Sequence, residues 1–453
     1  MTNKKNYFRI ITLVIVFVAA VSMLGASIGE KGKTKNYIIV SKSNKLPNGL
    51  VKKIESLNGE ITKTCDRIGI AFATSSDSSF LAKASKIRGI RSVVPDFRYQ
   101  WISPRYDYRK NANPPSIGDD EPYFSLQWAL DAIDAPEAWN MGFLGSGVRV
   151  AVLDTGIDPT HPDLVPNWNY ALSLSLVASE PFIDDLDGHG THVAGIIGAA
   201  HNVFGTIGVA PSAEIVAIKV LDQTGSGNFS AILMGVYYAT LMEADVVNMS
   251  LGTYIMRHGF FDDLGDWVPA WAVAEFMVIL NRYMTFAYQN GVTVIATAGN
   301  DMIDMDHARD LVHIPSGATH ILSISATGPL SWFYDATTDL DVPAYYTNYG
   351  QSVIDFAAPG GNLDFSIYPG GPYYYDWVIS TYPGGWAWGI GTSQAAPHVA
   401  GVAALIIGKN GGSMHPAQVE AILKQSADDL GKRGKDDYYG HGRVNAYKAV
   451  TIK

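Results

Sequence analysis

Cysteine is almost absent from this chain of 453 residues, in which Cys65 is the single example. One cysteine excludes an internal disulfide framework, so a folded domain must be stabilised by the size of its core or by bound ions. Charged residues are also scarce, at 17%, whereas hydrophobic residues make up 47%. This balance excludes a disordered chain and predicts a globular one, long enough for a large core plus one smaller domain.

An apolar run from Ile10 to Leu24 lies near the N-terminus. Lys4, Lys5 and Arg9 precede it, and small residues follow. This order is typical of an export signal, which we assign to residues 1–27. An uncleaved membrane anchor is the alternative, but the run is shorter than the roughly 20 residues that a spanning helix needs. We therefore expect a secreted protein.

Charge is divided unevenly along the chain. Residues 1–102 hold 17 basic and 6 acidic side chains, a net charge of +11, while residues 103–453 hold 16 and 37, a net charge of −21. Such a contrast between two parts indicates separate roles. The acidic main part also argues against nucleic acid as a partner, because phosphate binding needs clustered lysine and arginine.

Residues 36–102 have the pattern of a small α+β domain. Short strands are expected at 37–40, within 60–74 and at 90–94, with helices at 47–57 and 79–87. The resulting order, β-α-β-β-α-β, is the split βαβ plan of ferredoxin-like domains.

Residues 103–118 separate this domain from the rest of the chain. Pro104, Pro114 and Pro115 lie among polar residues there, which is typical of an exposed linker and a favoured site of proteolytic cleavage.

Residues 119–453 alternate between short buried-type strands and helices. The expected strands are 148–153, 215–221, 245–250, 292–296 and 321–326, and the expected helices include 189–200, 230–244, 272–290 and 416–426. This alternation predicts an α/β fold with a mostly parallel sheet flanked by helices. Residues 330–390, rich in Gly, Pro and aromatic residues, are expected to form loops.

Three short blocks occur in a fixed order and carry groups suited to hydrolysis: 152–156 (VLDTG), 187–192 (DGHGTH) and 391–398 (GTSQAAPH). Ser393 would be the nucleophile at a helix N-terminus, where backbone N–H groups stabilise an oxyanion. His189 would take its proton and return it to the leaving amine. Asp154 would hold the imidazole tautomer, and Asn300, after Ala298-Gly299, would direct its amide at the oxyanion.

Each of these residues also has an ordinary structural role. Ser393 could be a helix cap, His189 a helix-surface residue, and Asp154 and Asn300 turn residues. Any one block could arise by chance, but all of them together in this order predict serine-nucleophile hydrolysis. A zinc peptidase is not indicated, since His189 and His192 do not form a His-Glu-x-x-His pattern.

These blocks and their order resemble the subtilase family of subtilisin-like serine peptidases, over roughly residues 120–450 by the motif positions. The resemblance implies an endopeptidase that forms an acyl-enzyme intermediate, acts on polypeptides and is made as a self-processing zymogen. Residues 36–102 resemble the inhibitory, chaperone-like propeptide of that family, with a primary cut near Ile102-Ser103. We expect a monomer whose own propeptide is its inhibitor.

Two further blocks resemble the edges of the family's substrate cleft. They are Gly225-Ser226-Gly227 and Ser250-Leu251-Gly252. An extended peptide would lie between them as an added strand, held by backbone hydrogen bonds.

A structural calcium site is also implied by the resemblance. The loop 200–206 has the length of the family's calcium loop, and the ligands would be Glu121, Asp163, Asn202 and the carbonyls of Ala200, Phe204 and Thr206. Oxygen ligands in this number suit Ca²⁺. The alternative is a solvated surface loop. A second acidic run, Asp184, Asp185 and Asp187, lacks the final Glu of a calcium loop, so helix capping by Asp187 is expected instead.

Two departures from the family pattern bear on substrate choice. Gln394 stands where a Met usually follows the nucleophile. In addition, the segments 253–290 and 330–390 are longer than the corresponding parts of the family's compact core. The extra segments add aromatic residues near the expected cleft. Two other functions therefore stay open: a catalytically dead binding protein, and a processing peptidase that docks one partner on those aromatic insertions.

Overall fold

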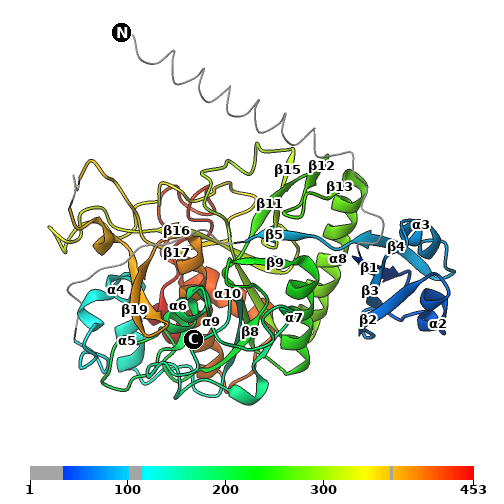
Figure 1. Ribbon diagram of the computed structural model, residues 1–453. Helices are drawn as coiled ribbons and strands as arrows, with labels where there is room; N and C mark the ends of the chain where they lie inside the picture. Colours follow the sequence, from blue (N-terminus) through cyan, green and yellow to red (C-terminus); the bar gives the residue numbers. More distant parts are fainter. Residues whose placement is uncertain (1–33, 102–114, 368–370, 453) are drawn as a thin grey trace, which may run out of the picture.

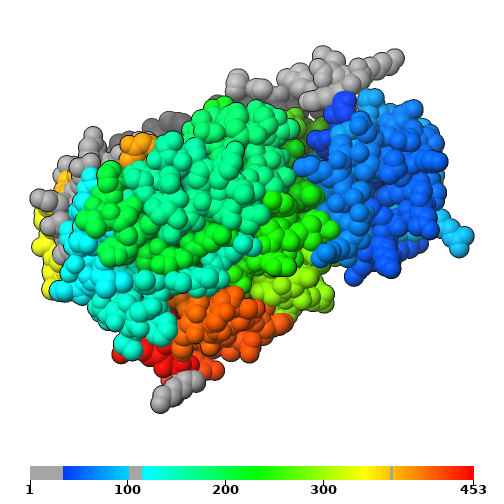
Figure 2. All heavy atoms as spheres, turned by 90° about the horizontal axis from the view of Figure 1, so that it is seen from below, coloured from blue at the N-terminus to red at the C-terminus, as the bar shows by residue number. Residues whose placement is uncertain are grey.

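The computed structural model describes residues 34–101, 115–367 and 371–452. The expected export signal, most of the expected linker and the expected cut at Ile102-Ser103 lie outside the described residues. A small N-terminal unit stands beside a large α/β unit, and strand β5 (Arg98–Gln100) runs from the first across the second (Figure 1). In the space-filling view the N-terminal unit forms a lobe against the main body (Figure 2).

The N-terminal unit has an antiparallel sheet with strand order β2-β3-β1-β4. Its elements are β1 Lys35–Ser41, α2 Leu50–Glu55, β2 Gly59–Cys65, β3 Ile70–Ser75, α3 Phe80–Ala84 and β4 Ile90–Pro95. This is the split βαβ plan predicted from the sequence. Successive side chains of β1 point to opposite faces. Tyr37 and Ile39 pack under α2 and α3, while Ile38 and Val40 join the core of the main unit.

The main unit is built on a seven-stranded sheet in the order β17-β16-β14-β10-β6-β8-β7, and every pairing in it is parallel. The strands are β6 Arg149–Asp154, β7 Leu174–Ser175, β8 Glu214–Lys219, β10 Val246–Met249, β14 Thr293–Thr297, β16 Ile321–Thr327 and β17 Phe356–Pro359. The predicted α/β fold with a parallel sheet is confirmed.

Helices cover both faces of this sheet. Val150 and Val152 of β6 pack toward α6 (His189–Gly198) and α9 (Thr392–Lys409), whereas Ala151 and Leu153 pack toward α7 (Phe229–Leu241) and α8 (Ala270–Gln289). The remaining helical segments are η1 Phe124–Leu126, α4 Trp128–Ala132, α5 Ala135–Asn140, η2 Tyr170–Leu172, η3 Tyr373–Asp376, α10 Pro416–Ser426 and α11 Ala446–Thr451. In the described ranges, no helix is both long and apolar enough to cross a lipid bilayer.

The prediction of loops throughout 330–390 was wrong. This segment contributes the edge strand β17 and the hairpin of β18 (Val378–Tyr382) and β19 (Gly385–Gly389). Its Gly and Pro residues, which suggested loops, include the Pro383-Gly384 turn between the two hairpin strands. The hairpin fixes α6, because Ser380 Oγ donates to the carbonyl of His192 at 2.8 Å and Thr381 Oγ1 to that of Thr191 at 2.7 Å.

The longer segment at 253–290 folds beside the cleft. Strand β11 (Thr253–Met256) pairs with β15 (Leu311–Ile314), and β12 (Gly259–Phe261) forms a hairpin with β13 (Trp267–Pro269) that leads into α8. Phe260 of this hairpin is buried against the N-terminal unit, while the adjacent Phe261 is exposed.

Candidate active site

Asp154 and His189 form a buried pair at the carboxyl end of the parallel sheet. Asp154 is the last residue of β6, and its Oδ1 lies 2.7 Å from Nδ1 of His189. Both side chains are almost completely buried, and Asp154 Oδ1 also accepts the N–H of Thr155. The carboxylate thereby fixes the orientation of the imidazole through Nδ1. The ring nitrogen that Asp154 does not engage is Nε2.

His189 is the first residue of α6, and acidic side chains hold that helix start. Asp185 Oδ2 accepts from the N–H and the hydroxyl of Thr191, at 2.8 and 2.7 Å. Asp187 Oδ1 accepts the N–H of His189 at 3.1 Å, as the sequence led us to expect, so the two carboxylates share the capping. A Cβ on Gly190 would lie 2.2 Å from the carbonyl oxygen of Gly156, so glycine is needed for α6 to approach β6.

Ser393 lies in the first turn of α9, after Gly391 in the N-cap position. Its hydroxyl donates to the carbonyl oxygen of Ser250 at 3.1 Å, and Ser250 Oγ donates in return to the carbonyl of Ser393 at 2.7 Å. The single hydroxyl proton of Ser393 is therefore directed at Ser250 in this structure. Free N–H groups at a helix start favour a developing negative charge, so this position suits a nucleophile.

Asn300 faces the same cleft and is held by the residue before Ser393. Its Oδ1 accepts both the N–H of Thr392, at 2.9 Å, and the Thr392 hydroxyl, at 2.8 Å. Because the oxygen is engaged in this way, the NH₂ group points away from Thr392 and is the part of the amide left to serve as a donor. Thr392 was missed in the sequence, where nothing links it to a residue 92 positions earlier.

The two predicted edges of the cleft enclose the chain's own residues 98–101. Strand β5 pairs antiparallel with β9 (Ser226–Asn228), and the N–H of Trp101 donates to the carbonyl of Gly225 at 3.0 Å. The indole N–H of Trp101 donates to the carbonyl of Gly227 at 2.9 Å.

The opposite edge of the cleft contacts residues 98–101, here called the tail, more weakly. Gly252 N–H donates to the Trp101 carbonyl at 3.4 Å, and Leu251 is fully buried beneath. The tail thus lies as an added strand, and Gln100 and Trp101 line one cavity together with Asn300 and Ser393.

His313 supports both sides of this cavity from below. A Cβ on Gly252 or on Gly299 would lie 2.8 Å from its ring. Burial lowers the pKa of His313 to about 4, so the ring is neutral near pH 7. Its position makes it a packing element of the cleft floor, which no sequence motif signalled.

The predicted calcium loop encloses a carboxylate. Glu121 Oε1 accepts the N–H groups of Asn202 and Val203, and Oε2 accepts those of Phe204 and Gly205, at 2.6 to 3.2 Å. These four bonds occupy about all the lone-pair sites of a carboxylate. Glu121 therefore anchors the loop as an internal anion, which differs from its predicted use as a metal ligand.

The other predicted ligands retain free oxygens among the described residues. Asp163 Oδ1 and Asn202 Oδ1 are buried without a hydrogen-bond partner, although Asp163 Oδ2 accepts from Thr206 N–H and from Trp386 Nε1. Within the described ranges no backbone N–H donates to the carbonyls of Ala200, Phe204 or Thr206. This oxygen set fits a hard cation. Asp120, Glu121 and His201 also lie close together, but His201 Nε2 is engaged with Asp120 Oδ1 at 2.8 Å.

The fold and the site together define a class of protein. The structure holds a buried Asp154–His189 pair at the carboxyl end of a parallel α/β sheet, and it places Ser393, at a helix start, in one cavity with Asn300. These are the groups that a serine peptidase uses. The chain belongs to the subtilase family, whose model matches residues 145–442. It is a subtilisin-like serine endopeptidase.

Individual relatives extend the likeness beyond the matched region. The chain is 32% identical to subtilisin E of Bacillus subtilis (strain 168) over 461 aligned positions, covering 99% of this chain and 100% of that one. It is 30% identical to a lanthipeptide protease of known structure, with a TM-score of 0.61, over 72% of this chain and 95% of that chain.

A third likeness concerns the fold alone. The epidermin leader peptide processing serine protease of Staphylococcus aureus gives a TM-score of 0.73 at 21% identity, over 93% of this chain and 98% of that chain.

Proposed function

We propose that this subtilisin-like endopeptidase is a secreted, self-processing zymogen, in which residues 36–102 are an inhibitory propeptide. The observation that carries the proposal is the strand pairing of residues 98–100 with 226–228. A chain segment that occupies the substrate cleft in extended form blocks other polypeptides, and it also presents its following residues to Ser393. Secretion rests on the apolar run at Ile10–Leu24.

The proposed reaction follows from the groups around Ser393. Rotation of its hydroxyl from Ser250 toward Nε2 of His189 lets the imidazole take the proton as Oγ attacks the scissile carbonyl. The oxyanion of the tetrahedral intermediate accepts from Asn300 Nδ2 and from the N–H of Ser393. Imidazolium, stabilised by Asp154, then protonates the leaving amine, and water hydrolyses the acyl-enzyme by the same steps.

A Ser393→Ala variant tests this proposal. The wild-type chain should shorten itself in a host without other proteases and take up a fluorophosphonate label, whereas Ser393→Ala should do neither. Ser413→Ala, which removes an exposed hydroxyl far along the chain, is the matched control and should behave as wild type. A Ser393→Ala chain that appears already shortened would contradict self-processing, and an unlabelled wild type would favour the catalytically dead alternative.

A structural calcium ion is part of the same proposal. Asp163, Asn202 and the carbonyls of Ala200, Phe204 and Thr206 would hold it, with Glu121 as the anion that shapes the loop. Such an ion supplies positive charge to a cluster of buried oxygens and takes no part in the chemistry.

A dedicated processing peptidase is the second candidate. It is favoured by the aromatic hairpin of β12 and β13 beside the cleft and by the likeness to a lanthipeptide protease. Digestion of a denatured proteome separates the two candidates: many cut sites indicate a general endopeptidase, and cuts confined to one extended motif indicate a processing enzyme.

A further inference from the structure

Three consecutive residues before and at the start of strand β5 each have a dedicated partner on the main unit. Asp96 meets the start of α7, Phe97 enters an aromatic cluster, and Arg98 pairs with Asp222. We call the partners together the α7 socket: Asp222, Phe229, Ser230, Phe260 and Phe276. The socket is continuous with the cleft, because Arg98 is also the first residue of β5.

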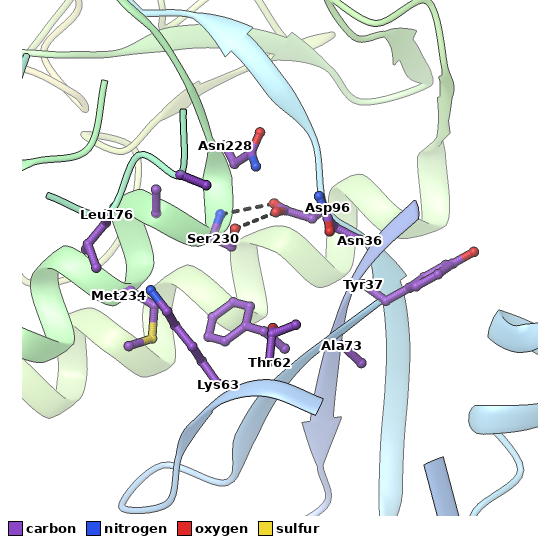
Figure 3. Close-up of a pocket in the computed structure, with 13 residues that line it drawn as sticks. Asn36, Tyr37, Thr62, Lys63, Ala73, Asp96, Leu176, Asn228, Ser230 and Met234 are labelled. Carbon is purple, nitrogen blue, oxygen red and sulfur yellow. Dashed lines mark hydrogen bonds between the residues drawn. The ribbon is translucent and has the colours of Figure 1, made fainter. Parts of the chain in front are cut away.

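The first position caps a helix of the main unit. Helix α7 has 13 residues, and the side chain of its N-cap residue Asn228 makes no capping bond. Asp96 takes that role: its Oδ1 accepts the N–H of Ser230 at 3.0 Å, and its Oδ2 accepts the Ser230 hydroxyl (Figure 3). The carbonyl of Phe97 accepts the N–H of Phe229 at 2.8 Å. Two of the unpaired N–H groups of α7 are thus satisfied by the N-terminal unit.

The second position is an aromatic pocket. The ring of Phe97 is 1% exposed, and its centroid lies 5.0 Å from that of Phe229, 5.4 Å from Phe260 and 4.8 Å from Phe276. Phe260 and Phe276 belong to the 253–290 segment. Part of that long segment therefore supplies two walls of the pocket around Phe97.

The third position is an ion pair. Arg98 Nη2 lies 2.5 Å from Oδ2 of Asp222, whose side chain is only 9% exposed. A largely buried carboxylate that loses its cation is destabilised, so Asp222 favours renewed pairing with a basic side chain.

Removal of the N-terminal unit would take away the partners of the Phe229 and Ser230 N–H groups and of Asp222 Oδ2, while Asp222 Oδ1 keeps its hydrogen bonds from Thr224. We propose that the α7 socket of the processed enzyme is a second substrate-binding site, which selects polypeptides carrying Asp or Asn, then an aromatic residue, then a basic residue upstream of the cleaved bond. The proposal rests on the proposed function. If the bond equivalent to Ile102-Ser103 is cut, the three residues stand seventh, sixth and fifth before it.

The occupant is a polypeptide because the site continues the substrate strand. A chain that pairs with Ser226–Asn228 in the direction of β5 necessarily carries its preceding residues into the socket. Asp and Asn both offer an acceptor oxygen to Ser230, whereas the aromatic cluster and Asp222 specify the next two positions.

Peptide hydrolysis by the self-processed full chain tests the proposal. The substrates are the peptide of residues 94–105, its Phe97→Ala and Arg98→Ala forms, and a short peptide that begins at Tyr99. Cleavage of the short peptide reports on the proposed function alone. Burial of a phenylalanine side chain predicts that Phe97→Ala lowers kcat/KM by about 10- to 100-fold.

Two enzyme variants separate the socket from general effects. On Phe260→Ala, replacement of Phe97 in the peptide should cost less than about threefold, since the pocket wall is gone. On Phe261→Ala, which alters the exposed neighbouring ring, the full preference should remain. The rate on the short peptide checks that both variants are folded. If the wild-type enzyme cleaves the unmodified peptide and its Phe97→Ala form with equal kcat/KM, or if Phe260→Ala keeps an undiminished preference, the proposal is overturned.

Discussion

Ser250 and Ser393 are joined by two reciprocal hydrogen bonds, each hydroxyl donating to the other residue's carbonyl oxygen at 2.7 and 3.1 Å. The cleft edge that follows β10 is thereby tied to the first turn of α9. The nucleophile's position is fixed by its backbone, while its hydroxyl needs only a rotation about χ1 to change partner. The adjacent pair, Asn300 and Thr392, is joined differently, because the N–H and the hydroxyl of Thr392 both donate to Asn300 Oδ1.

The Asn300–Thr392 pair predicts two graded losses of activity. Asn300→Ala should lower kcat by about 10²–10³ with little change in KM, a magnitude that comes from a subtilisin lacking one oxyanion donor. Thr392→Val keeps the shape but removes one bond to Asn300 Oδ1, so a loss of about 2- to 10-fold is expected. Steady-state kinetics on one peptide measures both.

Met302→Ala is the control for these variants, because this side chain is exposed two residues beyond Asn300. Its kinetics should match the wild type. A Thr392→Val variant that changed KM alone would indicate a role in binding and not in orienting the amide.

Calcium removal should lower the thermal midpoint of the protein. An ion that binds only the folded state stabilises it by about 2.7 kcal/mol at 100 times Kd, which is a shift of several degrees. Asn202→Ala removes one of the proposed oxygen ligands, so EDTA should change the midpoint of this variant little. Asn290→Ala, at the end of α8, should keep the wild-type response to EDTA. Equal EDTA shifts for wild type and Asn202→Ala would place the ion elsewhere.

Docking of the N-terminal unit should depend on pH through Asp96. Burial at the α7 start, with a smaller contribution from Asp262, raises the pKa of Asp96 from 3.8 to about 6, although the bonds from Ser230 oppose the shift. A carboxyl group with a raised pKa contributes stability that is fully present below pH 3.8 and is lost as the pH rises through about 6.

Asp96→Asn removes this titration and resembles the protonated acid. In the uncut Ser393→Ala chain, adding Asp96→Asn should raise the free energy of unfolding at pH 7.5 by about 1–3 kcal/mol, and the gain should shrink toward about pH 4. Denaturant melts at several pH values measure the difference. A gain that is the same at both ends of this pH range would show that Asp96 does not titrate on docking.

The sequence was sufficient for the parallel sheet, because long apolar strands reveal a sheet buried on both faces. It also predicted Asp154, His189 and Ser393 as catalytic residues, and the first two form a buried hydrogen-bonded pair. Thr392 and Asp185 could not be recognised, because Ser, Thr and Asp near helix starts are common and only the folded contacts show which oxygen they hold.

Prediction from the sequence was also limited where residues far apart in the chain come into contact. Glu121 was expected to bind metal, but its carboxylate is enclosed by the N–H groups of residues 202–205, which lie 81 to 84 positions later in the chain. Strands β17 to β19 were missed because the segment's richness in Gly, Pro and aromatic residues suggested loops, although β19 (GWAWG) alternates small and aromatic residues. Tertiary contacts, and not local preference, decide both cases.

Gln394 is completely buried beside the nucleophile, and within the described residues neither its amide oxygen nor its nitrogen has a hydrogen-bond partner. An unsatisfied buried amide costs about 1–3 kcal/mol, so Gln394→Met and Gln394→Leu should both raise the free energy of unfolding by a similar amount.

Peroxide should then distinguish the Gln394→Met variant from the Gln394→Leu variant. The thioether of Met oxidises to a polar sulfoxide next to the oxyanion site, whereas Gln and Leu have no such chemistry. Brief peroxide treatment should therefore reduce turnover of Gln394→Met markedly and leave the wild type and Gln394→Leu close to their starting rates. Equal inactivation of all three, at matched oxidation of the other methionines, would show that residue 394 does not control oxidative loss.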